Sequence, residues 1–143
     1  MRHPGAVAVV PVLADGRVVL VRQWRAAVGE DVLEIPAGIR DVDGEATEVT
    51  AGRELAEEVG YRATEPLVLL TAFWNTVGLS DEACHVYLAT GLEPCPDDRQ
   101  GAEEEAMTIE LVHLDDVPAM VADGRIRDSK TVIGLLLARH HLG

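Results

Sequence analysis

Residues 38–61 read GIRDVDGEATEVTAGRELAEEVGY and carry the clearest periodic pattern of the chain. A spacing near 100° per residue places the apolar and small side chains of residues 45–59 on one side of a helix. These residues are Val49, Gly52, Leu55, Ala56 and Val59. Gly60 is the expected stop, because glycine readily takes the left-handed backbone conformation that ends a helix. The segment therefore predicts one amphipathic helix over residues 45–59.

Three glutamates share roughly the opposite face of this predicted helix. Glu54 and Glu58 are one turn apart, and Glu57 lies three residues after Glu54. Like charges at these spacings destabilise an isolated helix by about a few tenths of a kcal/mol per pair. A bound cation would offset that repulsion, whereas the simpler interpretation is an acidic face exposed to water. The helix and its charges leave both interpretations open.

The pattern of residue types over the whole segment distinguishes a metal site from an acidic face exposed to water. Its specified residues are Gly38, Glu45, Arg53, Glu54, Glu57, Glu58 and Gly60. They reproduce the motif G-x5-E-x7-R-E-U-x-E-E-x-G-U and resemble the Nudix box, with Leu55 and Tyr61 at the U positions. Seven specified positions match by chance in about one window in 10^8. The gap from Gly38 to Glu45 is one residue longer than the family pattern, a change that a surface loop can absorb.

The resemblance implies a divalent metal site on this helix. It implies that Glu54 and Glu58 ligate Mg²⁺ together with the carbonyl of Ala37, and that Glu57 ligates or supports a second ion. Magnesium prefers hard oxygen ligands and keeps several waters, so carboxylates are suitable donors, and Mn²⁺ is a possible substitute. Arg53 is expected to pair with a neighbouring carboxylate and fix its rotamer.

Three further residues of the box are expected to have structural roles rather than to bind metal or substrate. Glu45, at the predicted helix start, is expected to stabilise the helix and the preceding loop. Gly38 is expected to help end the strand before the box, and Gly60 is expected to end the helix inside it. Both expectations rest on the wider range of backbone angles that glycine can adopt.

A second acidic cluster, Glu103-Glu104-Glu105, follows a polar segment rich in proline and aspartate. By itself it reads as a solvated loop. Its place in the chain resembles that of a loop in the ADP-ribose pyrophosphatase branch of the family, which carries an E-x-E pair. That resemblance implies Glu103 as general base and Glu105 as metal ligand, with Glu57 as the competing base.

Shorter segments extend the resemblance to this branch over nearly the whole chain. They are residues 2–7, 21–25, 34–38, 78–82 and 124–126. Within them, the expected substrate-binding residues are Trp24, Arg25, Glu34, Gly78, Ser80 and Glu82. The last three lie in the segment that resembles the branch's substrate loop.

Each expected substrate contact has a simpler alternative. Arg25 could clamp a phosphate through paired donors, and Glu34 or Glu82 could accept hydrogen bonds from ribose hydroxyls. The alternative for these charged residues is a surface ion pair. Trp24 is expected to stack on the base, although a tryptophan in a strand is more often part of the core.

Two departures from the branch bear on substrate choice. Val77 stands where the branch commonly has proline. The arm that precedes this region in many members is missing from this sequence.

Length and composition limit the number of domains, the compartment and the kinds of partner that are expected. A chain of 143 residues, 48% of them hydrophobic, predicts a single domain over residues 1–143. No apolar stretch has the length of a membrane helix, and no signal peptide pattern is present. Two cysteines without zinc spacing favour a cytoplasmic protein. The net charge of -13 argues against nucleic acid as a partner. The resemblance implies a homodimer.

The rest of the chain predicts short strands and two further helices. A β-hairpin is expected over residues 5–21, with a turn at residues 14–16, and a strand at 32–35 that stops at 36–38. Further strands are expected at residues 66–73, 83–90 and 108–114, and helices at 118–122 and from Asp128 to about 140. This mixture predicts an α/β fold with a mixed sheet between helices. The resemblance implies a Nudix-type α/β/α sandwich.

The expected reaction is magnesium-dependent hydrolysis of the diphosphate in a nucleoside diphosphate that carries another group. The resemblance implies ADP-ribose as substrate, giving AMP and ribose 5-phosphate. The alternatives are nucleotide sugars such as GDP-mannose, dinucleotides such as NADH, oxidised nucleoside triphosphates, and a Nudix-like module that senses a nucleotide without cleaving it.

Overall fold

The computed structural model describes residues 3–95 and 106–143. Its elements in chain order are β1 (Ala6–Pro11), β2 (Arg17–Arg25), β3 (Glu30–Glu34), β4 (Ala37–Ile39), α1 (Thr47–Val59), β5 (Tyr61–Ala63), β6 (Val68–Trp74), β7 (Ala83–Ala89), β8 (Leu92–Pro94), β9 (Thr108–His113), a 3-10 turn η2 (Leu114–Asp116), α3 (Val117–Ala122) and α4 (Ser129–Leu142). No helix in these ranges is long and apolar enough to cross a membrane.

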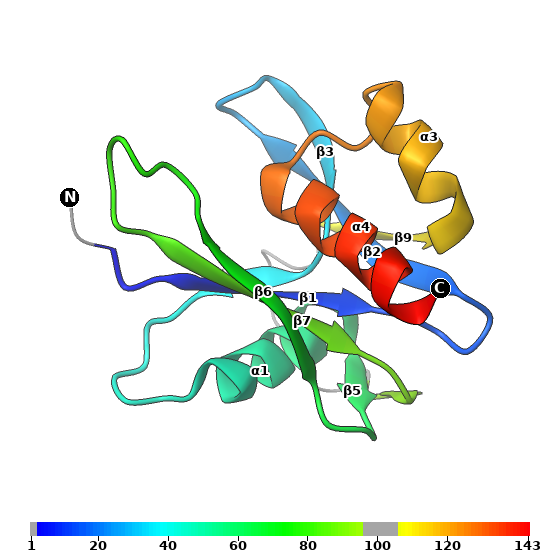
Figure 1. Ribbon diagram of the computed structural model, residues 1–143, viewed down its shortest axis with the longest axis horizontal. Helices are drawn as coiled ribbons and strands as arrows, with labels where there is room; N and C mark the ends of the chain where they lie inside the picture. The colour runs from blue at the N-terminus through cyan, green and yellow to red at the C-terminus, as the bar shows by residue number, and fades with distance from the viewer. Residues whose placement is uncertain (1–2, 96–105) are drawn as a thin grey trace.

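The strands form a central layer between helices, as predicted. Side chains of β1 alternate between its two faces: Val7 and Val9 join a buried cluster with α1, whereas Ala8 and Val10 join a second cluster with α4. Figure 1 shows α1 on one side of β1 and β7, and α3 and α4 on the other side. The expectation of a mixed sheet in an α/β/α sandwich is therefore confirmed.

Strand pairing divides the layer into three sheets. The order of the largest is β4-β1-β7-β6, in which β1 and β7 run parallel and the other pairs run antiparallel. The second sheet is antiparallel, in the order β3-β2-β9, and β5 pairs with β8. The short strand β4, which leads into the loop before α1, is thus fixed directly to the buried strand β1.

The hairpin expected over residues 5–21 is confirmed only at its turn, where Val12 and Val18 form one antiparallel bridge. Gly16 has a φ of +87°, and its amide donates to the carbonyl of Leu13 at 2.9 Å. Beyond the bridge between Val12 and Val18, β1 and β2 separate into different sheets. Each strand has two hydrogen-bonding edges, and other strands occupy them: β4 and β7 flank β1, while β3 and β9 flank β2.

The buried face of α1 is rotated relative to the predicted one. Its buried residues are Thr50, Ala51, Leu55 and Val59. Val49 is 54% exposed, because a separation of two residues turns it about 200° away from Ala51. The helix itself and its glycine stop are confirmed, since Gly60 has a φ of +70° and its amide donates to the carbonyl of Ala56 at 3.0 Å.

Three short strands were not predicted. β4 begins at Ala37, where a stop was expected, because it pairs antiparallel with β1 immediately after Pro36. β5 and β8 have three residues each and pair with each other. Such segments are too short to show alternation, so long-range pairing alone defines them. The other predicted strands and helices correspond to β3, β6, β7, β9, α3 and α4 within a few residues.

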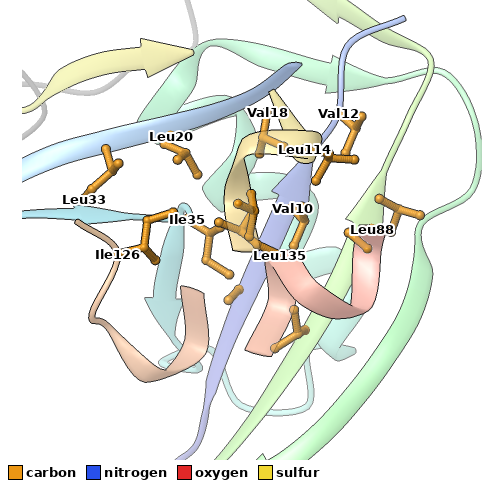
Figure 2. Packing of buried hydrophobic residues seen from close by; sticks show 14 of the residues in the cluster. Val10, Val12, Val18, Leu20, Leu33, Ile35, Leu88, Leu114, Ile126 and Leu135 are labelled. Carbon is orange, nitrogen blue, oxygen red and sulfur yellow. The ribbon is translucent and has the colours of Figure 1, made fainter. Parts of the chain in front are cut away.

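Gly52 of α1 and Gly134 of α4 provide a test of this packing. A methyl group on Gly52 of α1 would meet nothing within 4 Å, whereas one on Gly134 of α4 would lie 3.0–3.1 Å from Val10, Ile35 and Val86. These residues belong to the core cluster shown in Figure 2. We expect Gly52→Ala to stabilise the fold by about 0.5–1 kcal/mol through helix propensity. We expect Gly134→Ala to destabilise it by about 1–3 kcal/mol through overpacking.

Urea unfolding at neutral pH measures both changes, with the wild-type chain as reference. Equal stabilisation by the two substitutions would show that α4 moves away from the sheet at little cost.

Candidate active site

The carboxylates of α1 meet the backbone of β4. A methyl group on Gly38 would lie only 2.2 Å from Cδ of Glu54, so the glutamate packs directly against the glycine backbone. The amide of Ala37 donates to Oε2 of Glu58 at 3.1 Å. Because β4 is paired with β1 and α1 packs on β1, two short segments that are separated in the sequence by the loop before α1 come together here. Glu58 thus lies beside Ala37, and Glu54 lies against the adjoining Gly38, so three of the predicted metal ligands come close together.

Glu57 is on the same helix and, like Glu54 and Glu58, is partly buried. Within residues 3–95 and 106–143, no three His, Cys, Asp or Glu side chains converge into a ready-made metal site. The donors present are carboxylate oxygens beside a backbone segment, which is a suitable chemistry for a hard cation that keeps some of its waters. The described residues therefore fit a partial magnesium shell rather than a closed one.

Arg53 connects the start of the box to its helix. Its Nη2 lies 2.7 Å from Oε1 of Glu45, and its Nη1 lies 3.7 Å from Oε1 of Glu54. Thr50 also donates to Oε1 of Glu45, at 2.6 Å. The hydrogen bonds from Thr50 and Arg53 lower the pKa of Glu45. The closest partner of Arg53 is therefore Glu45. The guanidinium of Arg53 lies farther from Glu54, one of the three glutamates that share a face of the helix.

An ion cluster centred on the buried Glu34 lies between the β2–β3 hairpin and the start of α4. The guanidinium of Arg25 donates to Glu34 through Nε at 2.7 Å and Nη2 at 2.9 Å. Lys130 donates to Glu34 at 2.8 Å and to Asp128 at 2.9 Å. Only 3% of the Glu34 side chain is exposed. The two predicted substrate residues Arg25 and Glu34 are thus partners of each other.

Lys130 is not predictable from the sequence as part of this site, because its contact with Glu34 spans 96 residues and has no local pattern. The cluster lines a cavity of about 710 Å³. Figure 1 shows the β2–β3 hairpin beside the first turn of α4. Residues of both segments line this cavity.

Electrostatics keeps both central groups of the cluster ionised. Burial raises the pKa of Glu34, but the hydrogen bond from Arg25 and the charge of Lys130 outweigh it, so the net shift is downward. Burial lowers the pKa of Lys130, but the charges of Asp128 and Glu34 produce a net upward shift. At neutral pH the cluster therefore contains two cations and two anions.

We expect Glu34→Gln to destabilise the fold by about 3 kcal/mol at pH 7, because it leaves two cations without their shared anion. The pKa of Glu34 is lower in the folded chain than its ordinary value of 4.5, so its contribution is complete above pH 4.5 and is lost as pH falls through the folded pKa. Urea unfolding of wild type and variant at pH 7 and pH 3 measures this loss. A difference that does not shrink at pH 3 would contradict it.

The predicted substrate loop connects β6 to β7. Oγ of Ser80 accepts a hydrogen bond from the amide of Glu82 at 3.1 Å, and the carboxylate of Glu82 lies 2.9 Å from Nε2 of His3. Gly78 and Ser80 line a cavity of about 500 Å³ together with Trp74, which is 68% exposed. A large aromatic surface therefore adjoins the loop.

Trp24 points outward from β2. It is 61% exposed, so the alternative of a core tryptophan is wrong. Its neighbour in the chain is Arg25, whose side chain belongs to the ion cluster.

Glu103 and Glu105 lie outside the described residues. A further cavity of about 760 Å³ lies between the β1–β2 turn and the end of α4, and none of its lining residues is a predicted site residue. Cavity size alone therefore does not identify the active site.

Comparison with known proteins agrees with the box and the fold. The family model for the NUDIX domain matches residues 1–133. ADP-ribose pyrophosphatase of Bacillus subtilis (strain 168) is 38% identical over 135 residues, which cover 94% of this chain and 72% of that protein. GDP-mannose pyrophosphatase of Yersinia pestis (strain Pestoides F) is 33% identical over 137 residues, covering 89% and 66%.

A solved structure described as an ADP compounds hydrolase has a similar fold, with a TM-score of 0.85. It is 26% identical, and the match covers 96% of this chain and 72% of that chain. With the carboxylates of the box gathered on α1 against β4, and with this similarity over almost its whole length, the chain belongs to the Nudix hydrolase family.

Proposed function

We propose that this enzyme hydrolyses the diphosphate linkage of a nucleoside diphosphate that carries a second group, with ADP-ribose as the preferred substrate. The observation that carries the proposal is the meeting of Glu54 and Glu58 with the backbone of Ala37 and Gly38. Such an arrangement supplies oxygen donors at one point of the surface, where a cation and a diphosphate can bind together.

Nudix hydrolases generally use divalent metals such as Mg²⁺. We propose Mg²⁺ here, with Mn²⁺ as a substitute, held by Glu54, Glu58 and the carbonyl of Ala37, with Glu57 as a further ligand. When bound, the ion lowers the pKa of water and neutralises charge on the diphosphate.

The residues of the chain supply positioning and proton transfer. Arg25 uses two of its five N–H donors on Glu34, and two of the remaining three lie on the Nη1–Nη2 edge of the guanidinium, which is suited to a phosphate. We propose Glu103 as the general base that accepts a proton from water, with Glu57 as the alternative, and Glu105 as a further metal ligand.

Substrate preference follows from the relatives and from exposed aromatic residues. A relative that is 38% identical carries the name ADP-ribose pyrophosphatase. Trp24 and Trp74 are both exposed and offer faces on which a base can stack, Trp24 being our first choice. Gly78, Ser80 and Glu82 are the proposed contacts with the rest of the substrate. GDP-mannose is the second candidate, because a 33% identical relative is named for its hydrolysis.

A substrate panel with product identification tests the proposal. The purified chain is incubated with Mg²⁺ and, separately, with ADP-ribose, GDP-mannose, NADH and an oxidised nucleoside triphosphate. We expect the highest kcat/KM with ADP-ribose and the release of AMP and ribose 5-phosphate. Reaction in ¹⁸O-labelled water, followed by mass spectrometry of both products, identifies the phosphorus that is attacked.

The result that would overturn this function is tight binding of a panel member without turnover in Mg²⁺ or Mn²⁺. That outcome would identify a sensing module. Higher kcat/KM with GDP-mannose would keep the reaction and change the substrate.

We also propose a homodimer in the cytoplasm. Sedimentation velocity at micromolar concentration tests the assembly. The chain has only two cysteines, without the spacing of a zinc site, which suits a reducing compartment. Burial raises the pKa of the Cys84 thiol to about 11, so this side chain stays protonated.

A further inference from the structure

We propose that Lys130, in the first turn of α4, is a positioning residue of the active site. Acting through Glu34, it holds the guanidinium of Arg25 in the orientation that binds the substrate phosphate. The inference rests on the proposed function for the role of Arg25, but the ion cluster that carries it is a feature of the fold.

Lys130 is the only lysine of the chain, and only 19% of its side chain is exposed. Burial of an ammonium group is costly unless anions surround it. Two carboxylates do so here: Oε1 of Glu34 lies 2.8 Å from Nζ, and Oδ2 of Asp128 lies 2.9 Å from it. The lysine is therefore held at both contacts, and its position follows that of α4.

Glu34 transmits this position to Arg25. Its Oε1 accepts from both Nζ of Lys130 and Nη2 of Arg25, while its Oε2 accepts from Nε of Arg25. The carboxylate is almost fully buried, so water cannot readily replace a missing donor. Lys130 thus fixes the rotamer of Glu34, and the bidentate pairing fixes the plane of the guanidinium.

The same turn of α4 also holds the strand that leads to the carboxylate site. Oγ1 of Thr131 donates to Asp128 at 2.6 Å and accepts from the amide of Ile35 at 3.0 Å. Ile35 follows Glu34 and precedes the segment containing Ala37. The start of α4 therefore supports two neighbouring parts of the site, the arginine and the β4 backbone.

Charge gives the lysine a further effect on substrate binding. Arg25 and Lys130 balance Glu34 and Asp128, and the charge of Glu58 also acts on Arg25. Loss of the ammonium would leave a net negative charge beside an anionic diphosphate, and the buried Glu34 would depend on Arg25 alone. We therefore expect weaker substrate binding, seen mainly in KM.

The kinetic test is a double-mutant cycle between Lys130 and Arg25. We expect Lys130→Met to lower kcat/KM about tenfold, mainly through KM, and Lys130→Arg to recover most of that loss. In the Arg25→Ala background, Lys130→Met should cause a much smaller loss, because the part of its effect that passes through the arginine is already gone and only the effect of its charge remains. Losses that multiply in the double variant would overturn the proposal while leaving the hydrolase function intact.

A second measurement does not depend on turnover. In nitrogen-15 NMR spectra, the Nε–H of Arg25, assigned with Arg25→Lys, should give a dispersed signal that exchanges slowly with water in wild type. Lys130→Met should shift it and speed its exchange. An unchanged Arg25 signal would overturn the proposal even if no panel substrate were hydrolysed.

The matched control is Arg125→Met, which removes the cation of an exposed pair with Asp123. It should change neither the Arg25 signal nor KM. Thermal unfolding of every variant separates loss of fold from loss of positioning, and the Lys130→Arg variant keeps the test decisive if Lys130→Met does not fold.

Discussion

Replacement of Glu58 by glutamine is expected to lower kcat by about 10^3-fold or more with little change in the fold. Glutamine has the same shape, and its amide oxygen can still accept the hydrogen bond from Ala37, which Oε2 of Glu58 accepts at 3.1 Å in the wild-type chain. It lacks the negative charge that holds a divalent cation, so stabilisation of the reacting phosphate is lost. Initial rates with ADP-ribose over a magnesium titration measure the effect.

Glu48→Gln is the matched control for this prediction. Glu48 lies in the first turn of the same helix, is exposed, and loses the same charge on substitution. It should retain wild-type kcat and the same magnesium dependence. If Glu58→Gln kept more than a tenth of wild-type kcat, Glu58 would not be a ligand of the catalytic ion.

Replacement of Gly38 by alanine is expected to lower kcat/KM by about 10^2-fold. The added methyl group would lie 2.2 Å from Cδ of Glu54, which is closer than any real contact, so the carboxylate must move. Displacement of one ligand weakens metal binding even though no charge is lost. We expect a higher magnesium concentration for half-maximal activity and a smaller magnesium-induced rise in Tm.

Gly52→Ala is the control for this steric prediction, because it adds the same methyl group to α1 where nothing lies within 4 Å. It should keep full activity and the normal magnesium response. A Gly38→Ala variant with wild-type magnesium dependence would show that Glu54 can bind the ion from another position.

The local parts of the fold were the predictable ones. Helix α1 and its stop at Gly60 follow from periodicity and glycine chemistry within 16 residues, and the structure confirms them. The pairing of β1 was not predictable in this way. Its valines are equally compatible with a hairpin partner, and only competition from β4 and β7 for its two edges excludes β2.

In the candidate site, too, the features set by local spacing were predictable and those set by long-range contacts were not. The spacing of Glu54, Glu57 and Glu58 on one helix face is visible in the sequence, because helix geometry relates near neighbours. For Arg25 and Glu34, the sequence indicates an ion pair only as an alternative to a substrate contact and does not identify the partner. The further partner of Glu34, Lys130, is not predictable, since no local period connects residues 96 positions apart.

By itself, the sequence determined the family, the carboxylate helix and the class of reaction. Each depends on residue types at short fixed spacings, which α-helical geometry converts into one face. Tertiary structure alone decided that Gly38 lies under Glu54, that Trp24 is exposed, and that the start of α4 supports Arg25 through Glu34. These contacts arise when strands pair and a helix packs over them, and burial then selects partners that no local pattern specifies.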